Sequence, residues 1–247
     1  MTDYHIHIGQ FYEVYYDAHE IFEIIDSLIN QTGITRVCYS STSSCRNDAE
    51  LILVEEEIAY AQAYVPSRSD FSAEPYLWYI PKYAEQGISV LSATQNFEYC
   101  GIKLHSAAQQ WDFEKKEHFN SLHQIFQWAS DYDKSILIHC GTMQRTRPNR
   151  FEFFFREYPQ AKVVLAHSNP VTETAEMVNK YQNVFCDIAC TKEKNIIQLK
   201  QKVNKTKKIL FGSDFPINNY YNVKLFSKNC SLQEQYLEDC SRIVYLS

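Results

Sequence analysis

The sequence predicts an α/β fold, a (β/α)8 TIM barrel that forms a single domain over residues 1–247. Short apolar or β-branched runs alternate with longer helical patterns along the whole chain, as expected for repeated strand–helix units around a parallel sheet. Eight such runs start between residues 4 and 209. Their average spacing of about 29 residues is enough for one strand, one helix and two loops. Glycines mark the boundaries: Gly9 and Gly141 follow expected strands, and Gly33 and Gly101 precede them.

Each expected strand is a run of a few apolar or β-branched residues that ends at a turn or a polar residue. In chain order, the strands are expected at residues 4–8, 36–40, 76–80, 102–105, 136–139, 163–167, 184–188 and 209–211. The third strand has a second candidate at residues 88–91, because residues 66–100 show no clean period. Helical patterns are expected at residues 19–30, 49–64, 113–132, 150–158, 173–181 and 232–245.

The composition is that of an ordinary globular chain. Hydrophobic residues make up 45% of the 247 residues and charged residues 22%, which argues against a disordered chain or a fibre. The net charge of −6, without a basic stripe, gives no reason to expect a nucleic-acid partner. No apolar run approaches the roughly 20 residues of a membrane helix, and residues 1–4 do not resemble a secretory signal, so a cytoplasmic location is expected. The aromatic content of 15% leaves a homo-oligomer open.

The eight cysteines are expected to be thiols, because no CxxC motif occurs and a chain of this length needs no disulfides. Cys38, Cys140 and Cys186 fall in apolar runs, where a buried thiol behaves as a small hydrophobe. The spacing of Cys186 and Cys190 matches neither a zinc finger nor a redox motif, so a structural use is favoured for both.

Polar residues close most of the expected strands, at the end where a barrel of this kind builds its active site. They are His5, His7, Lys103, His105, His139, His167, Asp187 and Asp214. His5 and His7 are alternate residues of one strand, so both imidazoles face the same side, an arrangement that suits a divalent metal ion. His139 and His167 each end an otherwise apolar strand. Asp214 offers an anionic ligand or a base beside a metal-bound water.

The remaining candidates leave alternatives open. Lys103 is expected to be a carboxylated bridge between two metals, a partner of the substrate's charge, or a partner of a buried acid. His105 orients the substrate or supports a metal ligand. Asp187 is a supporting acid or a substrate contact, and Arg145 lies in a loop where it could grip an anionic substrate.

Taken in order, these motifs resemble the amidohydrolase superfamily, and in particular the family of aminocarboxymuconate semialdehyde decarboxylase and related TIM-barrel metal-dependent hydrolases. The resemblance spans essentially the full chain. It is carried by His5-Ile-His7, Gly101-Ile-Lys-Leu-His105, Leu137-Ile-His139, Val164-Leu-Ala-His167 and Phe211-Gly-Ser-Asp214-Phe-Pro216.

The resemblance implies a divalent ion, most often zinc with manganese as the alternative, held by His5, His7, His139 and Asp214. His167 is then a catalytic acid or base, and Lys103 and His167 join the ligands if two metals bind. The implied reaction is hydrolysis, in which metal-activated water attacks a carbonyl or phosphoryl centre of a small anionic substrate and Asp214 accepts the proton.

Two other functions stay open at this point. The first is decarboxylation or hydration of a small carboxylic acid, since the resembling family performs such reactions on the same constellation. The second is a barrel that binds metal without catalysis. Nucleic-acid hydrolysis of the TatD type is disfavoured, because those barrels typically carry a Glu on the fourth strand where this chain has Lys103.

Overall fold

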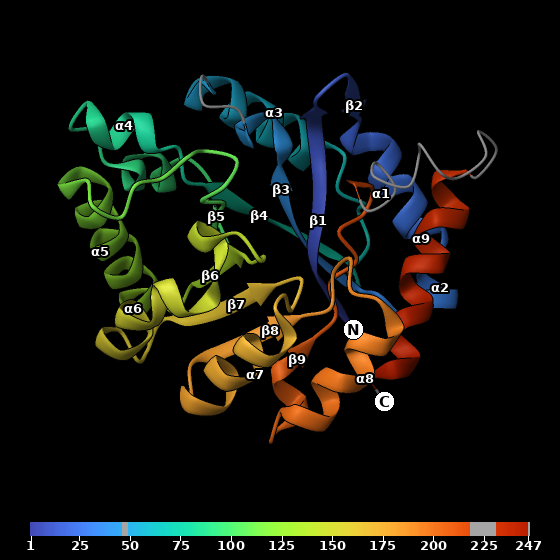
Figure 1. Cartoon of the computed structure of the whole chain (residues 1–247). Helices are drawn as coiled ribbons and strands as arrows, with labels where there is room; N and C mark the ends of the chain where they lie inside the picture. Colours follow the sequence, from blue (N-terminus) through green and yellow to red (C-terminus); the bar gives the residue numbers. More distant parts are fainter. Residues whose placement is uncertain (46–48, 218–230, 247) are drawn as a thin grey trace.

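The protein is a mixed α/β structure built on one curled sheet (Figure 1). The computed structural model describes residues 1–45, 49–217 and 231–246. Over these residues nine strands form the sheet, in the order β2-β1-β3-β4-β5-β6-β7-β8-β9. β1 and the strands from β3 to β9 run parallel to their neighbours in the sheet. β2 alone is antiparallel, and it forms a hairpin with β1. Short loops therefore connect only β1 to β2, and every later connection crosses over through helical turns.

The eight parallel strands coincide with the eight predicted runs to within a few residues. The strands are β1 Thr2–Phe11, β2 Val14–Tyr16, β3 Arg36–Ser41, β4 Ser72–Trp78, β5 Gly101–Leu104, β6 Ser135–His139, β7 Lys162–Ala166, β8 Val184–Asp187 and β9 Ile209–Leu210. β4 corresponds to the predicted third strand, and its second candidate is excluded because Val90–Gln95 forms a 3-10 helix. The sequence analysis did not predict β2, which has three residues, two of them exposed.

Helices cover the outer side of the curled sheet (Figure 1). They are α1 Ala18–Ser27, α2 Ile29–Thr32, α3 Leu51–Ala63, α4 Pro81–Glu85, α5 Lys116–Asp131, α6 Glu152–Glu157, α7 Val171–Lys180, α8 Glu193–Lys202 and α9 Leu232–Ser241. Their ends follow ordinary capping chemistry. Asp17 accepts a hydrogen bond from the amide of Glu20 at the start of α1, and Ser231 and Glu234 form a capping box at the start of α9.

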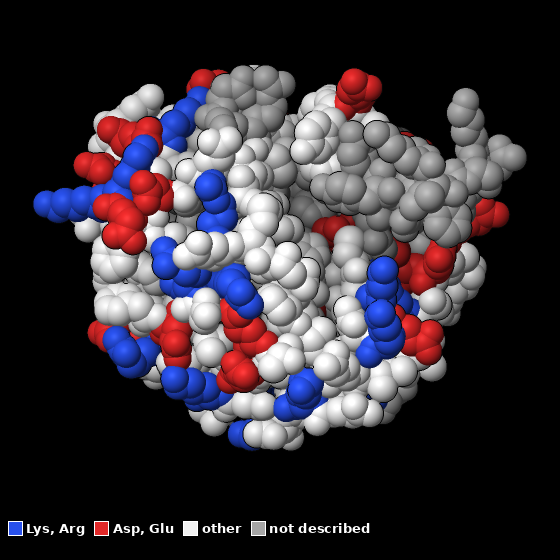
Figure 2. Space-filling view, viewed as in Figure 1, with Lys and Arg blue, Asp and Glu red and all other residues white. Residues whose placement is uncertain are grey.

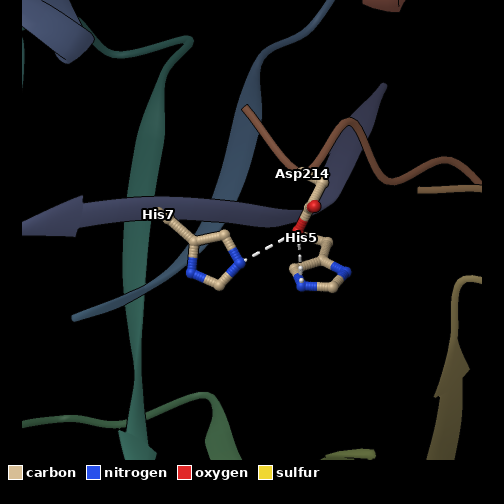
Figure 3. A group of neighbouring side chains, drawn as sticks. All are labelled: His5, His7 and Asp214. Atoms are coloured by element: carbon tan, nitrogen blue, oxygen red, sulfur yellow. Dashed lines mark hydrogen bonds and ion pairs between the residues drawn. The ribbon is translucent and has the colours of Figure 1, made fainter. Parts of the chain in front are cut away.

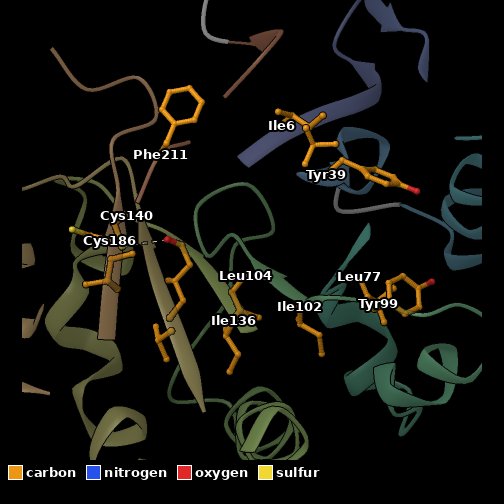
Figure 4. Close-up of a cluster of buried hydrophobic side chains, with 14 of the residues drawn as sticks. Ile6, Tyr39, Leu77, Tyr99, Ile102, Leu104, Ile136, Cys140, Cys186 and Phe211 are labelled. Atoms are coloured by element: carbon orange, nitrogen blue, oxygen red, sulfur yellow. Dashed lines mark hydrogen bonds between the residues drawn. The ribbon is translucent and has the colours of Figure 1, made fainter. Parts of the chain in front are cut away.

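The buried side chains form two layers, one on each side of the sheet. On β6, Ile136 and Ile138 join the outer cluster beneath the helices, whereas Leu137 joins a smaller inner cluster. Figure 4 shows part of the outer layer, to which successive strands contribute side chains such as Ile102 and Ile136. The alternation follows from the two-residue period of a strand, and it leaves the ends of the strands free to carry polar groups.

The curl brings the first strand beside the residues that follow the last one. The amide of Tyr4 donates to the carbonyl of Phe211 at 3.0 Å, and the amide of His7 donates to the carbonyl of Phe215 at 2.7 Å. The backbone amide of Asp214 donates a hydrogen bond to the carbonyl of His5, also at 2.7 Å. Two distant parts of the chain are therefore fixed against each other at the point where the sequence predicted metal ligands.

The surface carries charges of both signs. Figure 2 shows Lys and Arg interspersed with Asp and Glu over one face, with no broad region of a single sign. None of the helices that the structure describes is long and apolar enough to cross a membrane.

Candidate metal centre

A pocket of about 660 Å³ opens where the carboxyl ends of the parallel strands meet. Its lining comes from β1, β4, β5 and β6, and from the residues that follow β7, β8 and β9. In α/β barrels this end of the sheet is where catalytic side chains gather. Seven of the eight predicted strand-end candidates line the pocket. They are His5, His7, Lys103, His105, His139, His167 and Asp214.

His5, His7 and Asp214 point toward one another at the floor of this pocket (Figure 3). Oδ1 of Asp214 lies 3.0 Å from Nε2 of His7 and 3.3 Å from Nε2 of His5. The two histidines reach the same space because they alternate on β1, and the backbone bond from Asp214 to His5 holds the carboxylate opposite them. Each residue offers one ligand atom, and these atoms all lie within 4.8 Å of one another.

The hydrogen bonds behind His5 select the tautomer that a metal ligand needs. Nδ1–H of His5 donates to Oδ2 of Asp187 at 3.0 Å, so Nε2 carries the lone pair. That lone pair accepts a hydrogen bond from Nζ of Lys103 at 2.8 Å. Asp187 is itself fixed, because it also accepts bonds from the backbone amides of His167 and Ala189. An imidazole backed by a carboxylate is a common feature of metal sites.

His7 can present either tautomer. Its Nδ1 lies 3.0 Å from the hydroxyl of Ser40, which can donate or accept a hydrogen bond. When Nδ1 donates to Ser40, Nε2 is left as a lone pair that faces Asp214. The hydrogen-bond partners of both histidines therefore fit a bound divalent ion.

Burial also holds these groups in the protonation states that metals prefer. Burial lowers the pKa of His5 to about 3 and also lowers the pKa of His7, so both imidazoles are neutral at pH 7. Burial alone would raise the pKa of Asp214, but the neighbouring His5 and His7 hold it well below its usual range. Burial lowers the pKa of Lys103. Two neutral imidazoles and one carboxylate are a donor set suited to zinc or manganese.

His139 lies on the other wall of the pocket. Its ring stacks on that of His105 with the centroids 3.7 Å apart, and Trp78 stacks on the far side of His105 at 5.8 Å. Nδ1 of His139 lies 3.0 Å from Nε2 of His167. The structure therefore brings three of the four predicted ligands into one group, while His139 contacts His167 instead.

Several residues around the pocket have left-handed backbone conformations, which side chains other than glycine rarely adopt. The φ angles are 67° at His167, 44° at Ser168, 54° at Cys190 and 65° at Asp214. All four follow the carboxyl ends of β7, β8 or β9. Such conformations gather at functional sites, where the surrounding structure holds them in place.

The other predicted site residues occupy different positions. Lys103 and His105 line the pocket, as a role in substrate binding requires. Asp187 is fully buried behind His5, which corresponds to the predicted supporting acid and not to a substrate contact. Arg145 is exposed outside the described pocket lining, and its carbonyl accepts a hydrogen bond from the hydroxyl of Ser106.

Sequence reasoning missed several residues that line the pocket, among them Trp78, Cys190, Lys192 and Lys194. Cys190 and the two lysines follow the predicted seventh strand within a few residues, so their position was a usable signal. The Cys186/Cys190 spacing matches neither a zinc finger nor a redox motif, and a structural use was predicted for both. In the structure, Cys190 lines the pocket and its thiol lies 2.9 Å from Oδ2 of Asp214.

A family model described as Amidohydrolase matches residues 88–226, more than half of the chain. The chain belongs to this amidohydrolase family. The match covers β5 through β9 and so includes Lys103, His105, His139, His167 and Asp214. The resemblance inferred from the motifs is thereby confirmed.

Solved structures agree on the fold of this amidohydrolase. A 5-carboxyvanillate decarboxylase from Sphingomonas paucimobilis aligns with a TM-score of 0.53 at 12% identity, over 89% of this chain and 81% of that one. A hydrolase TatD family protein from Entamoeba histolytica aligns with a TM-score of 0.57 at 9% identity, over 99% and 89%. A second 5-carboxyvanillate decarboxylase, from Novosphingobium aromaticivorans, was solved with manganese and a nitrobenzoic acid ligand, and aligns with a TM-score of 0.50 at 12% identity, over 89% and 78%. A search of curated proteins finds no match to the sequence.

Proposed function

We propose that this amidohydrolase is a metal-dependent hydrolase that acts on a carbonyl or phosphoryl centre of a small anionic substrate. The observation that carries the proposal is the convergence of His5, His7 and Asp214 at the floor of an open pocket. We further propose one (β/α)8 domain over residues 1–247, with the ring completed by the hydrogen bonds between β1 and residues 211–215.

The proposed ligands are His5, His7 and Asp214, with zinc as the favoured ion and manganese as the alternative. His139 is proposed as a further ligand that reaches the ion by turning away from His167. When bound, the divalent ion supplies a Lewis acid and lowers the pKa of a coordinated water to about 7.

We assign proton transfer and substrate binding to side chains of the protein. Asp214 is ionised before the reaction. Its Oδ2 faces away from the imidazoles and accepts a proton during the reaction. With one metal bound, His167 serves as an acid or base: its Nδ1–H donates to the carbonyl of Ala189 at 3.2 Å, which leaves on Nε2 a lone pair that can take up a proton. Lys103, at the floor, and Lys192 and Lys194, at the wall, attract an anionic group.

Decarboxylation of a small carboxylic acid is a second candidate. It is favoured by the three lysines that line the pocket, since a substrate carboxylate needs a cation beside it. Trp78, His105 and His139 stack on one another and line the pocket, so a planar acid would find aromatic surface to contact there. Two solved structures of similar fold are 5-carboxyvanillate decarboxylases, which points the same way.

The first experiment is to measure the metal content of the purified, tag-free protein by mass spectrometry, beside a His5→Ala/His7→Ala variant. The wild type is expected to hold zinc or manganese, and the variant to lose the ion of this site. A Lys116→Ala variant, which changes an exposed residue at the start of α5, is the control and should keep the wild-type content. Equal metal content in wild type and double variant would contradict the proposed site.

Turnover then separates the candidate reactions. Ester, lactone, amide and phosphoester panels run in ¹⁸O-labelled water detect hydrolysis by incorporation of the label, and aromatic and muconate-like acids are assayed for carbon dioxide. In either case an Asp214→Asn variant is expected to lose activity by at least about 100-fold. Full metal occupancy without turnover on any panel would favour the third possibility, a barrel that binds metal without catalysis.

A further inference from the structure

A second group of ligand atoms shares Asp214 with the proposed metal centre. His167, Cys190 and Asp214 each offer one donor atom, and these atoms all lie within 4.8 Å of one another. The three residues come from different places: the end of β7, the turn after β8 and the segment after β9. Cys190 is exposed as a residue, and it lines the pocket with its sulfur beside Asp214.

The two oxygens of Asp214 face different partners. Oδ1 lies 3.0 Å from Nε2 of His7 and 3.3 Å from Nε2 of His5. Oδ2 lies 2.9 Å from Sγ of Cys190. A carboxylate that turns one oxygen toward each of two donor sets has the arrangement of a bridging ligand in a two-metal site, where the ions are about 3.5–4 Å apart.

His167 is oriented as a ligand in the same way as His5. Its Nδ1–H donates to the carbonyl of Ala189 at 3.2 Å, which leaves the lone pair on Nε2. That nitrogen faces Nδ1 of His139 at 3.0 Å, on the pocket side of the ring. Asp187 accepts the backbone amide of His167 and also backs His5, so one buried carboxylate positions a histidine of each donor set.

We infer that His167, Cys190 and Asp214 form a second site for a divalent ion, and that the ion is thiophilic, such as Zn²⁺ or Co²⁺. A thiolate selects borderline-soft ions over Mn²⁺ or Mg²⁺, whereas the imidazole and carboxylate set of His5, His7 and Asp214 accepts harder ions as well. Binding breaks the S–H bond of Cys190, forms a metal–sulfur bond and releases the proton to solvent, with no change in oxidation state.

This inference rests on the proposed function for the shared ligand Asp214, but it predicts a different signal. Each carboxylate oxygen offers two lone pairs, so Oδ2 can hold the second ion and still accept a hydrogen bond from a water molecule. Three protein ligands would leave such an ion a position for water or substrate, and all three residues line the pocket.

Cobalt titration of the metal-free protein tests the inference directly. A cobalt ion bound to a thiolate gives an intense sulfur-to-metal charge-transfer absorption that cobalt bound by imidazole and carboxylate alone does not give. The wild type is expected to bind two equivalents and to show this absorption. Cys190→Ser should bind one equivalent and lose it. Cys45→Ser, which changes another thiol of the same pocket, should behave as the wild type.

The His5→Ala/His7→Ala variant separates this inference from the proposed function. It is expected to bind one equivalent of cobalt and to keep the charge-transfer absorption. Loss of the imidazole–carboxylate site with the absorption intact would support the second site even if turnover were never found. One equivalent without thiolate absorption in the wild type would overturn it, as would absorption lost in Cys45→Ser and kept in Cys190→Ser.

Alkylation of the wild-type protein gives a readout that needs no variant. Iodoacetamide labelling followed by peptide mass spectrometry measures the rate at which each cysteine reacts. Zinc at 100 times its Kd is expected to slow the labelling of Cys190 by about 100-fold and to leave Cys45 unchanged. An unchanged labelling rate at Cys190 under saturating zinc would overturn the inference.

Discussion

Asp187 contacts His5 on the side away from the pocket and does not itself line the pocket. Its carboxylate accepts hydrogen bonds from Nδ1 of His5 and from the backbone amides of His167 and Ala189. An amide at this position has one oxygen in place of two, so one of these donors must lose its acceptor. Asp187→Asn is therefore expected to weaken metal binding by about 10–100-fold, as removal of such supporting groups does elsewhere.

Competition with a chromogenic chelator measures the affinity of the Asp187→Asn variant. The matched control is Asp133→Asn, which changes an exposed carboxylate paired with Lys162. The control should bind metal as the wild type does. Wild-type affinity in Asp187→Asn would show that the buried carboxylate does not orient the ligands.

Gly212 follows β9, at the point where the backbone passes His5, a proposed metal ligand. A Cβ atom at this position would lie 2.9 Å from Cβ of His5 and 3.1 Å from Cγ of Asp187. Neither neighbour can move without displacing the site. Gly212→Ala is expected to lower metal affinity at least tenfold and to destabilise the protein by about 1–3 kcal/mol.

Gly87→Ala is the control for this prediction. Gly87 has a φ angle of 75° and no atom within 4 Å of its missing Cβ, so alanine there strains only the backbone. It should lower the free energy of unfolding in urea and leave metal affinity unchanged. If Gly212→Ala also left metal affinity unchanged, the close approach would be irrelevant to the site.

The residue scale also shows where sequence reasoning succeeded and where it stopped. His5, His7 and Asp214 were predictable because strand periodicity fixes which way a side chain points, and because polar residues at apolar strand ends are conspicuous. The direction of Arg145 could not be predicted, because a loop residue can turn either way and no period determines its direction. The contact between Cys190 and Asp214 joins segments 24 residues apart, and only the folded chain shows it.

At the scale of elements, helix α3 is joined to β3 and the turn after it by a half-buried carboxyl group. The hydroxyls of Ser41 and Ser43 donate to Glu57 of α3. Burial raises the pKa of Glu57 above its ordinary value of 4.5, although the two serine hydrogen bonds oppose the shift. The folded protein therefore keeps the proton at pH values where the unfolded chain has released it.

The sign of the pH dependence follows from this difference in bound protons. Between pH 4.5 and the raised pKa the folded state binds more protons, so the free energy of unfolding falls as pH rises through that interval. The slope is at most about 1.4 kcal/mol per pH unit. Glu57→Gln, measured by urea unfolding without metal, should flatten this part of the profile. A slope equal to that of the wild type would mean that other groups cause the pH dependence of the free energy of unfolding.

Elements were predicted best where many residues repeat one pattern. The eight parallel strands are buried apolar runs, and burial on both faces makes such runs visible in the sequence. The hairpin strand β2 has only three residues and faces solvent, so it lacks that pattern. Helices α4 and α8 were not assigned: α4 has five residues, and the alternating charges of α8 obscure its buried Ile196 and Leu199.

At the scale of the whole molecule, the proposed metal ion would join the two edges of the curled sheet. His5 and His7 belong to β1, whereas Asp214 lies 207 residues beyond His7, in the segment after β9. Removal of the metal is therefore expected to weaken this junction. At a free metal concentration of 100 times the Kd, the ion stabilises the folded state by about 2.7 kcal/mol. Chelation should then lower Tm by about 5–10 °C.

Calorimetry with and without chelator checks this expectation, with the His5→Ala/His7→Ala variant as the control. The variant should show a smaller drop in Tm than the wild type. Hydrogen exchange adds local detail, because the amides of His7 and Asp214 bond across the junction and should exchange faster after chelation. An equal drop in both proteins would place the stabilising ion elsewhere.

The residues around the pocket that have left-handed backbone conformations lower the stability of the fold while they place side chains of the proposed site. A residue other than glycine in this conformation costs about 1 kcal/mol or more, and His167, Ser168, Cys190 and Asp214 all adopt it. Glycine at these positions would relieve the strain and remove the side chains that line the site. A related protein that did not carry out the proposed reaction would thus be more stable with glycine at these positions. The chain instead carries an imidazole, a thiol and a carboxylate at three of these positions, as expected of side chains that serve the proposed reaction and not the stability of the fold.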